Sequence, residues 1–268
     1  DTLFVAVFHW GVAGVAWATF LAQGAACVLA LMTLAQRLKR VQTAEKYELF
    51  SGDMLKRISR IAVPSILQQS FISVGNIFIQ SLVNSFGSSV IAGYSAAIKL
   101  NTFTITCFTT MGNGVSSFTA QNLGGGRIER VKKGFGAGIK MCLLAAIPFF
   151  IVFFIFGENM IQLFMSGDGG GTALETGKVF LRIVSPFYFV ISVKLIGDGV
   201  LRGAGAMRLF MIATFTDLVL RVLLSYILAG IFGVTGIWMS WPIGWSIATV
   251  LTCVFYRQGR WAQKYIVQ

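Results

Sequence analysis

The chain has 268 residues, of which 56% are hydrophobic and only 12% are charged. This apolar fraction lies above the roughly 45–50% of soluble domains, which excludes a soluble globular protein and indicates a multi-pass protein of the cell membrane, surrounded by membrane lipid. The net charge is +12, but its distribution does not indicate a nucleic acid partner. The basic residues fall in short segments between apolar runs, as in the cytoplasmic loops of membrane proteins.

Seven segments are predicted to be spanning helices, since a helix that crosses a bilayer needs ~20 apolar residues. They are residues 12–34, 61–83, 90–120, 135–156, 178–201, 209–231 and 236–256. Residues 1–8 are typical of the end of a further apolar helix, without an initiator Met or the charged start of a signal peptide. We therefore expect an all-α integral membrane protein with more sequence upstream.

A glycine motif opens both the first and the last of these segments. FHWGVAGVAW at residues 8–17 and FGVTGIW at residues 232–238 share Gly-Val-x-Gly between Phe and Trp. Such a repeat predicts equivalent helices in two similar halves, with a unit of six helices and a whole protein of about twelve. Chance is the alternative, because short Gly, Val and Trp strings are common in membrane helices.

The repeat and the charge pattern divide the chain into four predicted parts. Residues 1–36 end one lobe, 37–60 form a cytoplasmic linker, 61–256 form a complete six-helix lobe, and 257–268 form a cytoplasmic tail. Basic residues concentrate in the connectors after the first, third and fifth predicted helices and in the tail, whereas residues 157–177 form an acidic connector. Positively charged loops stay inside, so we expect a cytoplasmic C-terminus.

The sequence predicts no enzyme, metal centre or cofactor. Its four cysteines lie within apolar segments without CxxC spacing, and it has a single His. Residues 171–178 have G-x5-GK spacing, which is one residue too long for a phosphate-binding loop.

Two pairs of charged residues lie inside predicted spans. A charge near the bilayer centre costs ~2.5–3.5 kcal/mol on insertion scales, so such residues face a bundle interior or a wet cavity. Asp217 and Arg221 have opposite charges at i,i+4 spacing, and we interpret them as a structural ion pair. Lys194 and Asp198 share this spacing and fit a structural or a functional role equally well. In the functional reading, Lys194 lines a cavity and Asp198 couples a cation.

Uncharged polar residues follow one face of the predicted helix 61–83. Gln69, Asn76 and Gln80 are spaced seven and four residues apart, and neutral amides suit a cavity that binds varied cations. Hydrogen bonds between helices would explain them equally well. Lys99, in the next predicted helix, has no acidic residue within a turn, so it either reaches a partner on another helix or lines the cavity.

Six strings, in this order along the chain, resemble the C-terminal half of the MATE multidrug and toxin extrusion transporters. They are PSILQQSFISVGNIFIQSLVNSFG, VIAGYSAAIKLN, TAQNLGGGRIERVKKG, GVLRGAGAMR, DLVLRVLLSYIL and FGVTGIWMSWPIGW. Residues 1–23 resemble the end of the family's fifth helix and its sixth helix. The resemblance implies a twelve-helix exporter whose two lobes exchange a proton or sodium for cationic or amphipathic small molecules, by alternating access. The missing N-terminal lobe of the same chain would then be a partner.

The resemblance also implies a cation site. Asp1 matches the acid of the family's Asn-x3-Asp-Pro-x-Phe motif, although Thr2 replaces the Pro. Thr19 matches the Thr of a Gly-Ala-Ala-x-Ala-Thr stretch, here GVAWAT. Together with an acid from the missing first helix, they would bind a proton or sodium in the first lobe. The alternative is that Asp1 merely caps or solvates the end of a fragment. The predicted helix 61–83 lacks the membrane-embedded Glu that some members carry, which leaves coupling through that position in doubt.

Two other functions fit the sequence. One is a related flippase for lipid-linked oligosaccharides or polyprenyl lipids, which needs a more cationic cavity and draws some support from the unpaired Lys99. The other is a non-transporting membrane receptor or scaffold, which an upstream repeat in the gene would make untenable.

Overall fold

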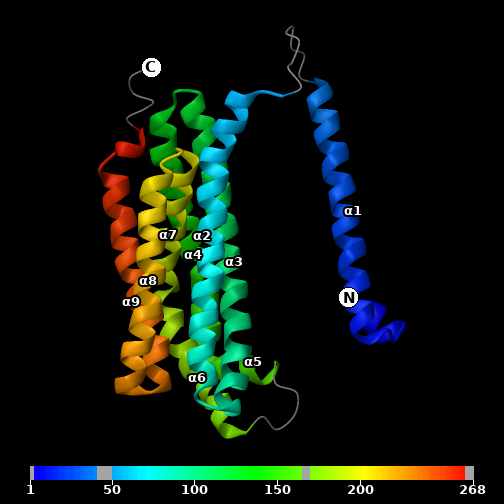
Figure 1. Cartoon of the computed structure of the whole chain (residues 1–268), viewed down its shortest axis with the longest axis vertical. Coiled ribbons are helices and arrows are strands. Elements are labelled where there is room, and N and C mark those ends of the chain that lie inside the picture. Colours follow the sequence, from blue (N-terminus) through cyan, green and yellow to red (C-terminus); the bar gives the residue numbers. More distant parts are fainter. Residues whose placement is uncertain (1–2, 41–49, 165–169, 263–268) are drawn as a thin grey trace. The chain divides into compact units, whose positions relative to one another are not determined.

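A computed structural model describes residues 3–40, 50–164 and 170–262, and all regular secondary structure in these ranges is helical (Figure 1). The chain divides into two compact units, Asp1–Asp53 and Met54–Gln268. Helix α2 begins at the boundary between them.

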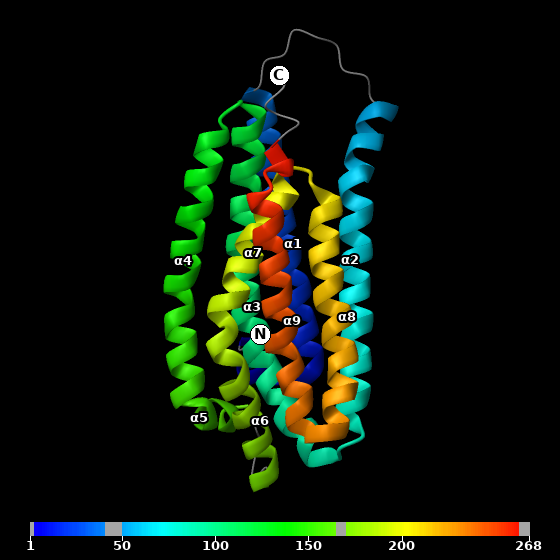
Figure 2. The same cartoon turned by 90° about the vertical axis from the view of Figure 1, so that its left-hand side faces the viewer.

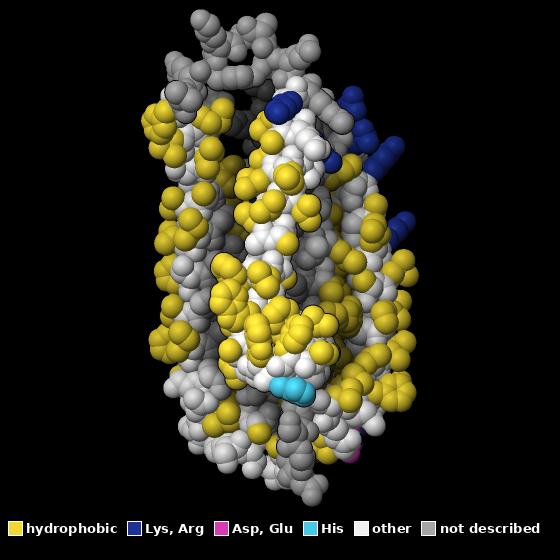
Figure 3. Space-filling model, turned by 90° about the vertical axis from the view of Figure 1, so that its right-hand side faces the viewer, with side chains coloured by type: hydrophobic (Ala, Val, Ile, Leu, Met, Phe, Trp, Pro, Cys, Tyr) yellow, Lys and Arg dark blue, Asp and Glu magenta, His cyan; other side chains and the backbone are white. Residues whose placement is uncertain are grey.

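The first unit consists of a short π-helical segment η1, Leu3–Val7, and helix α1, Gly11–Arg40. The ring of Phe4 lies 5.6 Å from that of Phe8 and 5.4 Å from that of Trp10, so η1 folds back onto the turn that starts α1. Figure 3 shows hydrophobic side chains along α1, with basic side chains near the end at which α1 stops. This distribution is the one expected of a spanning helix with a polar end.

The second unit holds the other helices. They are α2 (Gly52–Asn84), α3 (Ser88–Gly124), α4 (Ile128–Ile155), α5 (Gly157–Gln162), α6 (Gly171–Val184), η2 (Ser185–Phe187), α7 (Tyr188–Gly203), α8 (Met207–Phe232) and α9 (Val234–Arg257). Most of each predicted segment lies within one helix, but segment 178–201 is divided between α6 and α7. Pro186 explains the break, because proline lacks the N–H that would continue the α-helical hydrogen bonds, and a short 3-10 turn, Ser185–Phe187, takes its place.

Six of the described helical segments are long and apolar enough to cross a membrane: Gly11–Lys39, Gly52–Asn84, Ile128–Ile155, Gly171–Gly203, Met207–Phe232 and Val234–Arg257. The sequence predicted seven. The difference is α3, which is 37 residues long but is not one of the six. Asn101, Asn113 and several threonines lower its mean hydropathy.

The two copies of the glycine motif have the same construction. Gly11 and Gly233 both have left-handed backbone conformations, with φ of 54° and 60°. A Cβ on Gly14 would lie 3.0 Å from the carbonyl oxygen of Phe4, and one on Gly236 would meet that of Leu228. In each copy the first glycine makes the turn and the second lets the new helix approach the preceding segment closely.

Helices α2, α3, α4 and α6 to α9 run up and down along a common direction (Figures 1 and 2). Basic residues gather at the end of the second unit where α3 gives way to α4 and α7 to α8. They are Lys56, Arg60, Arg127, Arg130, Lys132, Lys133, Arg202, Arg208, Arg257 and Arg260. At the opposite end, the Lys178 ammonium pairs with Glu158 at 2.9 Å and Glu175 at 3.6 Å. The charge asymmetry predicted from the connectors therefore corresponds to two ends of one bundle.

Backbone contacts join α3 to α6 and α7. A Cβ on Gly112 would lie 2.7 Å from the carbonyl oxygen of Leu195, and one on Gly199 would meet the carbonyl of Gly112. Similar approaches occur between Gly203 and Ser116. Only residues without a side chain permit such contact, so these glycines fix where the cavity-facing sides of α3 and α7 lie.

Candidate functional site

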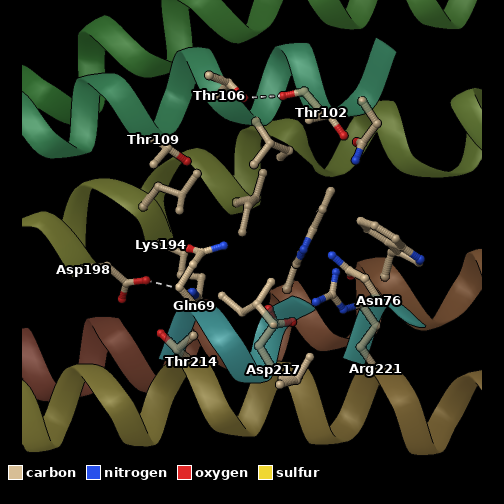
Figure 4. Close-up of a pocket in the computed structure, with 18 of the residues that line it drawn as sticks. Gln69, Asn76, Thr102, Thr106, Thr109, Lys194, Asp198, Thr214, Asp217 and Arg221 are labelled. Atoms are coloured by element: carbon tan, nitrogen blue, oxygen red, sulfur yellow. Dashed lines mark hydrogen bonds and ion pairs between the residues drawn. The ribbon is translucent and has the colours of Figure 1, made fainter. Parts of the chain in front are cut away.

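A cavity of about 630 Å³ lies within the second unit, between α2, α3, α7, α8 and α9 (Figure 4). Its walls are largely polar on α2 and α3 and charged on α7 and α8. The polar and charged residues that line it are Gln68, Gln69, Asn76, Gln80, Asn101, Thr102, Thr106, Thr109, Thr110, Asn113, Lys194, Asp198, Arg202, Thr214, Asp217 and Arg221.

The α2 wall carries the predicted amides. Gln69, Asn76 and Gln80 all line the cavity, because their spacing places them on one face of the helix. A neighbouring face of α2 packs against α8: the rings of Phe71 and Phe215 are 5.1 Å apart, and a Cβ on Gly75 would collide with Leu218. Packing on α8 thus directs the amides into the cavity.

The α3 wall is a row of threonine hydroxyls that the sequence analysis missed. Thr106 donates to the Thr102 carbonyl and Thr110 donates to the Thr106 carbonyl, both at 2.8 Å. Since each hydroxyl proton is used on the backbone, the oxygen lone pairs remain as acceptors toward the cavity. The spacing Thr102, Thr106, Thr109, Asn113 follows one helix face, and this periodicity was the sequence signal that could have found them.

The α7 wall contains a buried ion pair. Lys194 Nζ lies 2.7 Å from Asp198 Oδ2, and both residues are about 5% exposed. The Thr252 hydroxyl of α9 donates to Asp198 Oδ1 at 3.1 Å, so both carboxylate oxygens have partners. The predicted i,i+4 pair therefore forms and is anchored to α9.

Two side-chain hydrogen bonds connect α7 to α3. Arg202 donates to Asn113 Oδ1, and the Tyr188 hydroxyl donates to Asn101 Oδ1 at 3.1 Å. These amides accept with their oxygens and so act as fixed partners for the two α7 side chains. Neither bond was predicted, because each joins residues almost ninety positions apart.

The α8 wall differs from its prediction. Asp217 and Arg221 were interpreted as an ion pair, but their charged atoms do not come within 4 Å in the described structure. The Arg221 guanidinium instead lies over the ring of Trp241, 4.6 Å from its centroid, and Asp217 Oδ1 has no hydrogen-bond partner. The cation–π contact with α9 draws the arginine away from the aspartate.

Three predicted residues lie elsewhere. Lys99 is exposed and is not among the cavity-lining residues, because the cavity face of α3 runs through Asn101 and Thr102 instead. Thr19 is exposed on α1 in the first unit, and Asp1 lies outside the described residues. Among the described residues, no group of three or more His, Cys, Asp and Glu could hold a metal ion.

The bundle and its polar cavity define a multi-pass helical membrane protein that can enclose a small molecule. Residues 64–227 match the family described as MatE, which is more than half of the chain. The chain therefore belongs to the MATE family, whose members are transporters rather than enzymes.

Curated relatives show how much of such a protein this chain represents. It is 27% identical over 260 residues to the probable multidrug resistance protein YpnP of Bacillus subtilis (strain 168), covering 97% of this chain and 57% of that protein. It is 22% identical over 215 residues to the probable multidrug resistance protein NorM of Thermotoga maritima, covering 79% of this chain and 46% of that one. The chain thus spans about half the length of these relatives.

Solved structures share the fold. A Vibrio cholerae MATE transporter, VcmN, superposes with a TM-score of 0.85 at 18% identity, over 100% of this chain and 60% of that one. A MOP superfamily transporter from Pyrococcus furiosus gives a TM-score of 0.82 at 22% identity, over 96% and 58%. The helical arrangement is therefore that of part of a MATE-type transporter.

Proposed function

We propose that this chain is part of a secondary transporter that exports cationic or amphipathic small molecules in exchange for a proton or sodium. The observation that carries the proposal is the family match. A cavity lined by polar and charged residues, between helices of spanning length, supports it. A cavity of this kind between membrane helices suits a solute that must be bound and released rather than retained.

In this proposal the chain supplies one complete lobe. Residues 61–256 form the second six-helix lobe. Helix α3 also crosses the membrane in this lobe, in addition to the six apolar spans of the chain, and turns its polar face to the cavity. Residues 1–36 end the first lobe, 37–60 link the two, and 257–268 lie in the cytoplasm. Support comes from the equivalent glycine turns at Gly11 and Gly233 and from the basic end of the bundle.

The coupling ion binds through carboxylates in this proposal. Asp1 and Thr19 form a site in the first lobe, together with an acid of the missing helices. Asp198 is the candidate in the second lobe, and its burial among Lys194 and Thr252 supports a role tied to the cavity. Hard oxygen ligands of these types suit sodium, and a buried carboxyl also suits a proton.

The test uses the full-length transporter in proteoliposomes with a fluorescent organic cation and an imposed pH or sodium gradient. Asp1→Asn should abolish gradient-driven export while dye binding stays measurable, and Thr19→Ala should weaken coupling less severely. Undiminished antiport in the Asp1→Asn protein would move the assignment to Asp198, and no gradient-driven movement of any cation by the wild-type protein would refute the function.

The flippase alternative has lost the residue on which it rested. It drew support from an unpaired Lys99 in the cavity, whereas Lys99 is not among the residues that line it. Lys194, which does line the cavity, is paired with Asp198, so its charge is not free for a lipid diphosphate.

A further inference from the structure

Arg221 is a buried arginine without an acceptor. Its side chain is 6% exposed, and within the described residues it makes neither a hydrogen bond nor an ion pair. A guanidinium has five N–H donors and stays charged at every relevant pH. Buried polar groups are almost always satisfied, and a buried charge needs a partner, so Arg221 is placed to accept an anionic partner that enters the cavity.

The other two basic residues of the cavity have partners. Lys194 is held by Asp198 at 2.7 Å, and Arg202 donates to Asn113. Among these three basic residues, Arg221 is therefore the one that has neither a hydrogen bond nor an ion pair with the described residues. The acid nearest to Arg221 along the chain, Asp217, lies one helical turn earlier on α8 and forms no ion pair with it.

The side chains around Arg221 fix the position of its guanidinium. Trp241 lies under the guanidinium at 4.6 Å, and the indole Nε1 of the same residue has no hydrogen-bond partner. Figure 4 shows Arg221 and Asn76 reaching into the cavity from α8 and α2. An indole face fixes the plane of the guanidinium while leaving its N–H edge for a planar or tetrahedral oxyanion.

We propose that Arg221 and Trp241, with the Asn76 amide, form a subsite for an anionic oxygen group, a carboxylate or a phosphate, on the transported molecule. The inference rests on the proposed transport function and narrows its substrate class to amphipathic compounds that carry an anionic group. Asp217, a turn away, adds a negative charge to the same wall, which favours molecules that also carry a cationic part. Its Oδ1 is buried against α9, where a Cβ on Gly244 would lie 2.7 Å from it.

The experiment measures binding to the purified full-length transporter. The probes are two xanthene dyes that are identical except that one has a free aromatic carboxylate and the other its methyl ester, and a third dye has a phosphonate in that position. The variants are Arg221→Gln and Arg221→Lys. The matched control is Arg208→Gln, which removes an exposed arginine from the start of the same helix outside the cavity.

Arg221→Gln should weaken binding of an acidic dye by about 10-fold or more, because a hydrogen bond between charged groups is lost. Binding of the ester should change by less than about 2-fold on the same scale. Arg221→Lys should recover part of the affinity, since it keeps the charge without the planar fork. If the wild type binds one of the two acidic dyes more tightly and Arg221→Gln removes the difference, that dye identifies the anion. The control Arg208→Gln should bind all three dyes as the wild type does.

Three results would overturn the proposal: equal binding of ester and acidic dyes by the wild type, equal losses for both in Arg221→Gln, or no loss for either. Equal losses accompanied by a lower melting temperature would mean that an acid from the other lobe pairs with Arg221. Transport of the ester dye under an ion gradient is measured in parallel, so a failure of the subsite is distinguished from a failure of the transport function.

Discussion

Lys194 Nζ and Asp198 Oδ2 lie 2.7 Å apart on successive turns of α7, where both side chains are almost completely buried. The first prediction concerns this pair. Removing one charge from a buried pair leaves the other uncompensated and costs roughly 3–5 kcal/mol. Asp198→Asn should therefore lower the melting temperature of the detergent-purified transporter strongly, and Lys194→Gln/Asp198→Asn should restore most of the loss. A double variant as unstable as the single one would show that the pair is not coupled.

The second prediction concerns the contact between α3 and α7. A Cβ on Gly112 would lie 2.7 Å from the carbonyl oxygen of Leu195, whereas one on Gly114 in the same helix would meet nothing within 4 Å. Gly112→Ala should destabilise the protein by about 1–3 kcal/mol through overpacking. Gly114→Ala should be neutral or stabilise it by up to about 1 kcal/mol. Thermal unfolding of the two variants compares them directly, and equal melting temperatures would contradict the contact.

The third prediction concerns the two glycine turns. Gly11→Ala and Gly233→Ala each place a Cβ at positive φ, which costs roughly 1–2 kcal/mol. Gly230→Ala, near the end of α8 with open space around it, serves as the control and should not destabilise. Similar losses of thermal stability at Gly11 and Gly233 are expected if the turns are structurally equivalent. A loss at only one of them would argue against the repeat.

The fourth prediction concerns orientation. In a background without the four natural cysteines, a cysteine in place of Ser88, at the α2–α3 turn, should react with an impermeant thiol reagent added outside intact cells. A cysteine in place of Arg127, at the basic α3–α4 turn, should react only after permeabilisation. Both residues are exposed in the structure. The reverse pattern would place the basic end and the C-terminus outside.

Local patterns predicted the helices well. Their positions follow from apolar length, which is a property of consecutive residues, and the α2 amides follow from helical periodicity. Pro186 was the available signal for the break between α6 and α7, but a long apolar run concealed it. The threonine face of α3 was not predicted, because single hydroxyls within an apolar segment are a weaker sign of a cavity wall than charges or amides.

Contacts between distant segments could not be predicted. Arg221 and Asp217 have the spacing of an ion pair, and only the folded bundle shows that Trp241 of α9 competes for the arginine. Lys99 was assigned to the cavity because it lacked a local acid, although its helix face points elsewhere. Spacing along one helix defines which residues share a face, but the neighbouring helices decide what that face meets.

The glycine contacts between α3 and α7 also bear on how the cavity can change shape. At Gly112 and Gly199, where backbone meets backbone, no side chain lies between these two helices whose rotation would let them separate. They act as one rigid wall. Helix α2 instead meets α8 through side chains such as Phe71 and Phe215, which can repack. We therefore expect the α2 and α8 side to adjust when the cavity changes width, with the threonines and the ion pair as a fixed reference surface.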